Sequence, residues 1–116
     1  MVEVTLLNYL KDVFEDDNIP VYLERPEKRP TAEYIVMEKT GGTKTNLIPA
    51  NTFAFQSYGP TLYKASVLNE RVKTAVENAV ELEEISSVTL NSDYNFTDTV
   101  SKAYRYQAVF VITHYE

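Results

Sequence analysis

The feature that most constrains the fold is the C-terminal stretch, residues 102–115, with the sequence KAYRYQAVFVITHY. Its side chains alternate, and one face carries Tyr104, Tyr106, Ala108, Phe110, Ile112 and His114. The other face carries Ala103, Arg105, Gln107, Val109, Val111, Thr113 and Tyr115. A period of two over this length, rich in aromatic and β-branched residues, predicts a β-strand. We expect a long inner strand, covered by helices on its apolar face, on which the other strands pair.

Two stretches repeat their apolar residues with the period of an α-helix. Residues 3–17 predict an amphipathic helix with the apolar stripe Leu6, Leu10, Val13 and Phe14. Asn18 can adopt the left-handed conformation that ends a helix, and Pro20 prevents its continuation. Residues 59–61 (Gly-Pro-Thr) predict the start of a longer helix. Its apolar stripe is Ala65, Leu68, Val72, Ala75, Val76, Ala79 and Leu82.

Four further stretches are rich in strand-forming residues or alternate apolar with polar positions. They predict the remaining strands at residues 19–24, 33–40, 51–58 and 85–91. Prolines at the start of the first of these and just after it place that strand at a sheet edge. The whole pattern predicts a single α+β domain over residues 1–116. We expect a mostly antiparallel sheet of about five strands packed against two helices, in the order α-β-β-β-α-β-β.

The segment between the second and third predicted strands has two open interpretations. Gly41 and Gly42 can supply the positive φ of a tight reversal, which would end the preceding strand. Residues 43–50 then form either a hairpin with a long flexible tip or a β-arm that protrudes from the body. A protruding arm would expose Leu47 and Ile48, and such an apolar tip needs a partner to cover it.

Two connections carry polar residues that permit a functional interpretation. Residues 25–30 (RPEKRP) hold a basic cluster that can contact an acidic partner, but the acids interleaved with it favour a solvated, self-screened loop. Residues 92–99 are longer than an ordinary hairpin connection, which suggests a bulged or functional segment. Its oxygen-bearing side chains lack the spacing of a calcium loop, so turn-forming hydrogen bonds are the favoured role. These side chains are Asn91, Asp93, Asn95 and Asp98.

Composition and charge narrow the function further. The chain has 116 residues, a net charge of −6 and no basic arm, which argues against specific or sequence-independent binding to nucleic acid. No apolar run approaches the ~20 residues that a membrane span requires. The acidic N-terminal stretch does not resemble a signal peptide. The absence of cysteine excludes thiolate catalysis and cysteine-ligated metal.

No residue pattern indicates catalysis. His114 is the only histidine and has no HxxH or HExxH companion, so we expect a surface residue at the end of a strand. The adjacent carboxylates Glu83 and Glu84 indicate solvated groups and not a coupled acid–base pair. P-loop, GxGxxG and GxSxG motifs are absent. We therefore expect no catalytic residue, no cofactor, no metal site and no enzymatic activity.

Several whole phrases of the sequence, together with the order of the predicted elements, resemble one family of phage proteins. The phrases are PVYLERP (20–26), YIVMEKTGG (34–42), TFAFQSY (52–58), LNSDYNFTD (90–98) and YRYQAVFVI (104–112). They resemble the small tail terminator proteins, also called tail completion or minor tail proteins, of long-tailed phages and of prophages in Gram-positive bacteria. The resemblance covers nearly the whole chain, and its phrases are structural and not catalytic.

This resemblance implies a virion structural protein without enzymatic activity. Such subunits are expected to close into a ring, here a homo-oligomer expected to be hexameric, that caps the tail tube and ends its polymerisation. The implied partners are other copies of this chain, the tail tube protein and the head connector or closure protein. The implied location is the host cytoplasm during assembly and then the virion tail.

Because a closed ring requires two different adhesive faces on each subunit, the predicted arm becomes a candidate subunit interface. Its candidate residues are Thr43, Lys44, Asn46, Leu47 and Ile48. Two alternatives stay open at this point. One is another component of the phage neck, such as a head-closure or minor capsid protein, and the other is a soluble binding module unrelated to phages.

Overall fold

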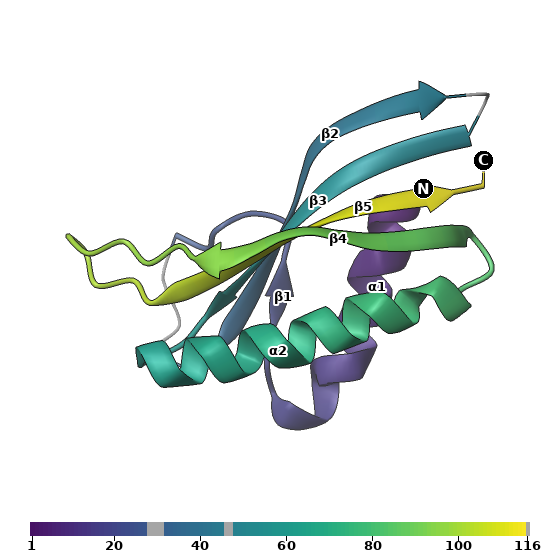
Figure 1. Ribbon diagram of the computed structural model, residues 1–116. Coiled ribbons are helices and arrows are strands. Elements are labelled where there is room, and N and C mark those ends of the chain that lie inside the picture. Colours follow the sequence, from purple (N-terminus) through teal and green to yellow (C-terminus); the bar gives the residue numbers. More distant parts are fainter. Residues whose placement is uncertain (28–31, 46–47, 116) are drawn as a thin grey trace.

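A computed structural model describes residues 1–27, 32–45 and 48–115, with the backbone alone for residues 43–45 (Figure 1). The elements follow the expected α-β-β-β-α-β-β order, so the predicted α+β class is confirmed. The helices are α1 (Val2–Phe14) and α2 (Leu62–Asn78), each followed by a single 3₁₀ turn, η1 (Glu15–Asp17) and η2 (Ala79–Glu81). The strands are β1 (Val21–Tyr22), β2 (Tyr34–Thr45), β3 (Ile48–Tyr58), β4 (Ile85–Asn95) and β5 (Arg105–His114).

The five strands form one sheet in the order β1-β2-β3-β5-β4. All neighbouring strands are antiparallel except β1, which pairs in parallel with β2 through Val21 and Tyr22 only. The C-terminal strand lies inside the sheet between β3 and β4, as its sequence predicts. The predicted edge position of the first strand is also confirmed.

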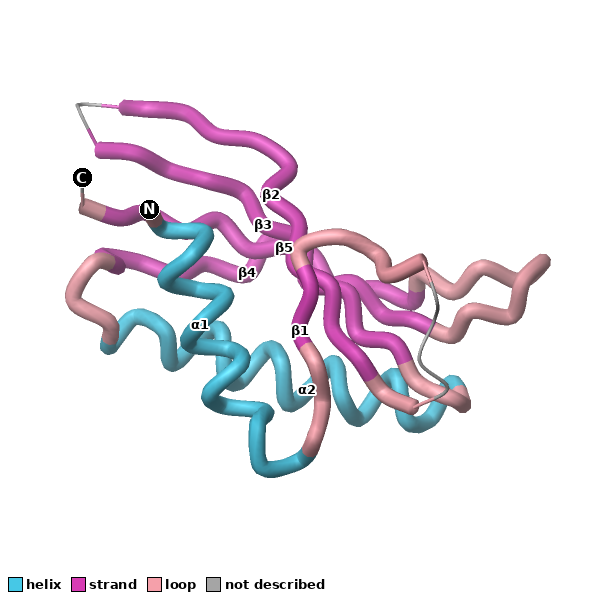
Figure 2. The backbone as a smooth tube through the Cα atoms, turned by 180° about the vertical axis from the view of Figure 1, so that it is seen from behind, coloured by secondary structure: helices cyan, strands magenta, loops and turns pink. Residues whose placement is uncertain are grey.

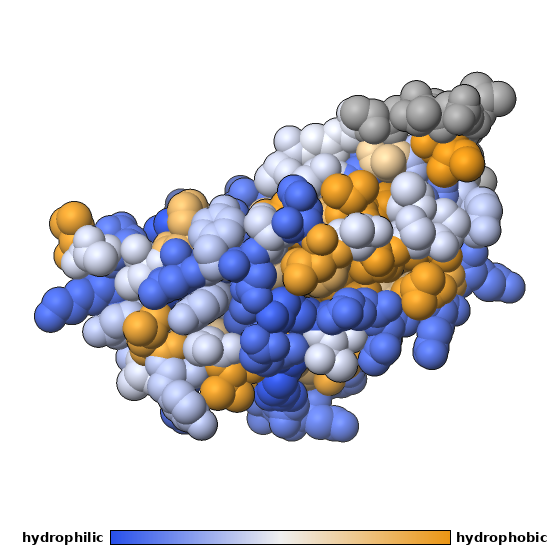
Figure 3. All heavy atoms as spheres, viewed as in Figure 1, coloured by the Kyte–Doolittle hydropathy of each residue, from blue (hydrophilic) through white to orange (hydrophobic). Residues whose placement is uncertain are grey.

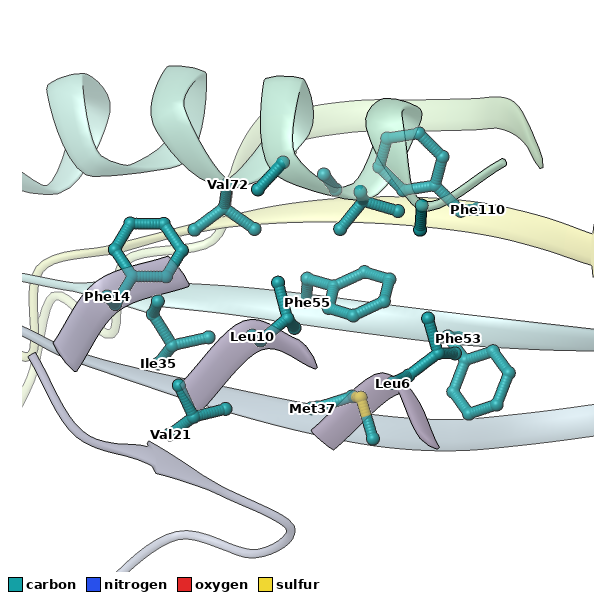
Figure 4. Packing of buried hydrophobic residues seen from close by; sticks show 14 of the residues in the cluster. Leu6, Leu10, Phe14, Val21, Ile35, Met37, Phe53, Phe55, Val72 and Phe110 are labelled. Atoms are coloured by element: carbon teal, nitrogen blue, oxygen red, sulfur yellow. The ribbon is translucent and has the colours of Figure 1, made fainter. Parts of the chain in front are cut away.

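Both helices cover the same face of the sheet (Figures 1 and 2). Between them and the strands lies a core in which Phe53, Phe55 and Phe110 are completely buried (Figure 4). The rings of Phe55 and Phe110 pack edge to face, with centroids 5.9 Å apart. Burying side chains of this size supplies most of the free energy that holds the layers together.

The helix boundaries have local causes that the sequence contains. Asn18 takes the left-handed conformation (φ 55°) and ends the turn after α1, as expected. Thr61 caps α2, because its Oγ1 accepts the backbone N–H of Lys64 at 3.1 Å. Gly59 is needed at the entry, because a Cβ there would lie 2.8 Å from the Ala65 nitrogen. Val13, which belongs to the predicted stripe of α1, is 41% exposed and lies outside the core.

Both long hairpins extend further than the sequence predicts. Gly41 and Gly42 do not reverse the chain: neither has a positive φ, and β2 continues through them to Thr45. Similarly, β4 continues past residue 91 to Asn95. The register shifts between Lys39 and Gly41 in β2 and between Leu90 and Ser92 in β4 mark bulges in these two strands.

Candidate interaction surfaces

The β2–β3 hairpin corresponds to the predicted arm and is paired along its length. Its ladder runs through Thr43↔Ala50 and Lys44↔Pro49 to Thr45↔Ile48. The last pairing between β3 and β5 is Ala50↔Thr113, so the end of the hairpin lies beyond the sheet proper. This geometry favours the β-arm over the hairpin with a long flexible tip. Asn46 and Leu47, two of the five candidate interface residues, lie outside the described residues.

Apolar side chains are exposed at the end of this arm and on the sheet beside it. Ile48 is 51% exposed at its described end. On the face that Figure 3 shows, apolar side chains gather over the strands on the side of the β2–β3 hairpin. Exposed apolar groups that cluster in this way are typical of surfaces that bind other proteins.

The β4–β5 hairpin forms a second projection, which extends at the left of Figure 1. Beyond the ends of the two strands, Phe96 donates its N–H to the Arg105 carbonyl at 2.9 Å, and Asp98 and Ala103 form an isolated bridge. Val100, at the tip, is 93% exposed. Residues 92–99 are predicted to be a connection, but residues 92–95 belong to β4, so the loop is shorter than predicted.

Hydrogen bonds within this tip explain its polar residues. Asn95 Oδ1 accepts the N–H of Thr97 at 3.0 Å, and Asp98 Oδ1 accepts the N–H of Val100 at 3.0 Å. Bonds from the Ser101 hydroxyl and from the backbone of Ser101 and Val100 lower the pKa of the Asp98 carboxyl. Asp93 instead faces α2, where it accepts hydrogen bonds from Asn69 (2.8 Å) and Lys73 (2.6 Å).

These acidic side chains do not converge. In the part of the chain that the structure describes, no three His, Asp or Glu residues gather as a metal site would require. His114 lies half-buried at the end of β5, where its Nε2 accepts from Asn51 Nδ2 at 2.5 Å. Its Nδ1 faces the Tyr115 carbonyl at 3.3 Å. These contacts give the ring a structural role in closing the end of the sheet.

The sheet face without helices carries a separate cluster that the sequence pattern does not predict. Tyr34 and Tyr58 stack with centroids 4.4 Å apart, and Val36 is buried beside them. Next to this pair, Gln56 Nε2 donates to Gln107 Oε1 at 2.8 Å, and Gln107 Nε2 donates to the Tyr94 hydroxyl. The network therefore ties β3, β5 and β4 together across the open face.

Two arginines complete this aromatic cluster. The guanidinium carbon of Arg25 lies 5.5 Å from the centroid of the Tyr58 ring, and that of Arg105 lies 5.7 Å from it. Arg105 also donates through Nη1 to the Tyr58 hydroxyl at 2.9 Å and stacks over Phe96 at 4.3 Å. Cation–π geometry of this kind holds a guanidinium in place without neutralising its charge.

The position of Arg25 corrects the expectation of a solvated loop at that residue alone, since residues 28–30 lie outside the described residues. A self-screened, solvated loop places its arginines in water, but Nε and Nη2 of Arg25 are buried. The sequence does predict the position of Arg105, because the alternation of the C-terminal strand places it on the same face as Gln107. The sequence does not predict the position of Arg25, because only the conformation of its loop brings it onto the ring of Tyr58, 33 positions away.

No protein-family model matches this sequence, and no curated protein matches it significantly. Among the described residues, no helix is both long enough and apolar enough to cross a membrane.

Proposed function

We propose that this protein is a virion structural protein that forms a ring on a phage tail tube, ends tube polymerisation and presents the surface to which the head docks. The observation that carries the proposal is the β2–β3 arm. Its ladder continues beyond the sheet proper and ends in the exposed Ile48. The resemblance of the whole sequence to tail terminator proteins gives this arm its proposed context. In that context the role is structural and without catalysis.

The arm is suited to contact between copies. A ring of identical subunits requires each one to present two different complementary surfaces. A paired hairpin that projects beyond the sheet, with apolar residues near its end, can supply one of them. The proposed partners are therefore other copies of the chain, the tail tube protein on one side of the ring and the head connector on the other.

The arm is tested by replacing Ile48 with Asp. A carboxylate at position 48 would have to lose its hydration to enter a contact between subunits, which costs free energy. We therefore expect the Ile48→Asp variant to stay folded but to lose self-association, which light scattering measures. Val67→Asp, at an exposed apolar position of α2 (42% exposed), is the matched control and should associate as the wild type does. Unchanged association of Ile48→Asp would exclude the arm as an interface.

The role in the virion is tested by deleting the gene in the phage that carries it. Loss of a tail terminator leaves full heads beside tails of uncontrolled length in electron micrographs. Heads that leak their DNA would indicate a head-closure protein instead. A wild-type protein that forms no ring, either alone or with tail tubes, would contradict the proposal.

A further inference from the structure

A groove runs along the edge of the sheet between β1 and the C-terminal half of α1. It consists of two adjoining hollows with volumes of about 590 and 600 Å³, which share Lys11, Val21 and Tyr22 in their walls. Figure 2 shows α1 and β1 side by side at this edge. In the described part of the chain, β1 pairs with β2 alone, so no strand covers its outer side. A groove of this size accommodates several side chains of a binding partner.

Apolar side chains remain exposed in this groove. Leu23 is 46% exposed, and Leu7 and Tyr22 are half-buried in the same wall. Pro20 and Pro26 add rigid apolar surface, because the proline ring fixes the backbone. Exposed apolar groups that line one concave surface favour contact with another molecule.

The rim of the groove is acidic. Its exposed carboxylates come from α1 with η1 and from the segment after β1, and they belong to Asp12, Glu15, Glu24 and Glu27. Within the described residues, none of these four forms an ion pair. Lys11 is exposed among them, and Arg25 is directed at the Tyr58 ring. The groove therefore favours an occupant that carries apolar side chains and a positive charge.

The end of the β2–β3 arm has that composition. Residues 43–50 (TKTNLIPA) contain Lys44 and no acidic residue. Ile48, at the described end of the arm, is 51% exposed. The tip of the β4–β5 hairpin is a poorer match, because over residues 96–102 the charge of Asp98 offsets that of Lys102. Of the two projections, the arm therefore complements the groove both in charge and in apolar surface.

The arm of one copy does not reach its own groove. In Figures 1 and 2 the arm ends at the top, whereas α1 runs away from it to a C-terminal end at the bottom. Backbone pairing from Thr43↔Ala50 to Thr45↔Ile48 holds the arm in this direction. The groove that an arm enters must therefore belong to another copy.

We propose that the end of the β2–β3 arm of one copy docks in the groove between α1 and β1 of the next copy. Ile48 covers the apolar wall at Leu23, and the acidic rim attracts the positive charge of Lys44. Each subunit gives its arm to one neighbour and its groove to the other, and repetition of such a contact generates a ring when the rotation closes. This inference rests on the proposed ring and identifies the surface that receives the arm.

The first test changes the apolar wall of the groove. Leu23→Asp should weaken self-association at least about tenfold by analytical ultracentrifugation, because the new carboxylate must lose its hydration when the arm docks. Val80→Asp adds the same charge at a position that is 47% exposed and outside the groove, and it should match the wild type. Association of folded Leu23→Asp at wild-type strength would overturn the proposal.

The second test combines a defective arm with a defective groove. Ile48→Asp keeps an intact groove and Leu23→Asp keeps an intact arm, so each should be monomeric alone. An equimolar mixture should form a complex of two chains and stop there, because the remaining arm and groove are both defective. Circular dichroism verifies that each variant is folded. Absence of the complex, or growth beyond two chains, would overturn the proposal.

The third test exchanges the charges. A variant with Asp12→Lys and Glu15→Lys in the groove, and a variant with Lys44→Glu in the arm, should each associate more weakly than the wild type. Their equimolar mixture should recover association, since each contact then again joins opposite charges. Glu77→Lys with Glu83→Lys gives the same net charge at exposed positions outside the groove and is the control. A folded mixture that does not recover would exclude the arm as the occupant.

These outcomes separate the groove from the proposed function. A complex of two chains in the mixture of Ile48→Asp and Leu23→Asp supports docking of the arm even if deletion of the gene leaves tail length unchanged. Rings that persist in Leu23→Asp, by contrast, would exclude the groove and leave the proposed ring intact.

Discussion

The two faces of the sheet bury different kinds of aromatic residue. The helix-covered face holds Phe53, Phe55 and Phe110, which have no polar atom and are entirely enclosed. The open face holds Tyr34 and Tyr58, whose rings pack while their hydroxyl groups remain able to form hydrogen bonds. The first face contributes stability through area and shape, and the second adds hydrogen bonds, because the Tyr58 hydroxyl binds Gln56 and Arg105.

The largest loss of stability should come from a substitution on the helix-covered face, at Phe110. Its replacement by Ala opens a cavity under both helices, and we expect the free energy of unfolding to fall by about 3–5 kcal/mol, measured by urea denaturation. Val109→Ala, next along the strand and half-buried on the open face, is the control and should cost much less. A loss below about 1 kcal/mol for Phe110→Ala would reverse the assignment of the faces.

A smaller effect is expected from Tyr58→Phe on the open face. The substitution keeps the ring that stacks on Tyr34 but removes the hydroxyl that binds Arg105 and Gln56. We expect a loss of about 1–2 kcal/mol, because the Arg105 donor loses its acceptor. Tyr63→Phe, at a hydroxyl that is exposed on α2, should be neutral. Equal stability of Tyr58→Phe and wild type would show that the cluster does not depend on this hydroxyl.

Replacing Arg25 should not lower the stability of the monomer in the way that replacing a core residue does. In Arg25→Met the unsatisfied buried nitrogens disappear together with the cation–π contact, so the monomer should keep its stability to within about 1 kcal/mol. Arg71→Met is the matched control. Arg71 pairs with Asp17 and stacks on Phe14 at 5.2 Å, and its loss should lower stability by about 1 kcal/mol. A larger loss for Arg25→Met, in thermal unfolding of dilute monomer, would give Arg25 a structural role within the subunit.

The smallest effect concerns the tip of the second hairpin. Hydrogen bonds lower the pKa of Asp98 below its ordinary value of 3.8, so their contribution is complete above that pH and is lost as pH falls through the folded-state pKa. We expect the amide signals of Val100 and Ser101 to shift in NMR spectra over that acidic window, and Asp98→Asn to remove the transition. A pH-independent spectrum of the wild-type tip would contradict this turn.

The sequence predicts those parts of the fold whose side chains repeat with a regular period. Leu6, Leu10 and Phe14 indicate the first helix, and Ala108, Phe110 and Ile112 indicate the inner strand, because burial on one face imposes the spacing. The strand ends are not predictable in this way. Beyond residue 40, β2 continues through backbone pairing with β3, and such pairing leaves no apolar alternation to detect.

The candidate interaction surfaces are predictable only in part. Ile48 can be recognised because Leu47 and Ile48 are apolar residues that directly follow the polar run of residues 43–46. The site at Tyr58 depends on Arg25 and Arg105, which lie far apart in the sequence and have no fixed spacing from it. Only the folded chain brings them together, since a loop conformation and a strand register both contribute.

The bulges in β2 and β4 affect how copies of this chain can meet. These are the outer long strands, and an uninterrupted outer strand would offer its free backbone groups to any neighbour as a template for endless sheet growth. An irregular backbone at Lys39–Gly41 and again at Leu90–Ser92 interrupts that template on both sides. The bulges therefore oppose the edge-to-edge pairing of copies that leads to fibrillar aggregation.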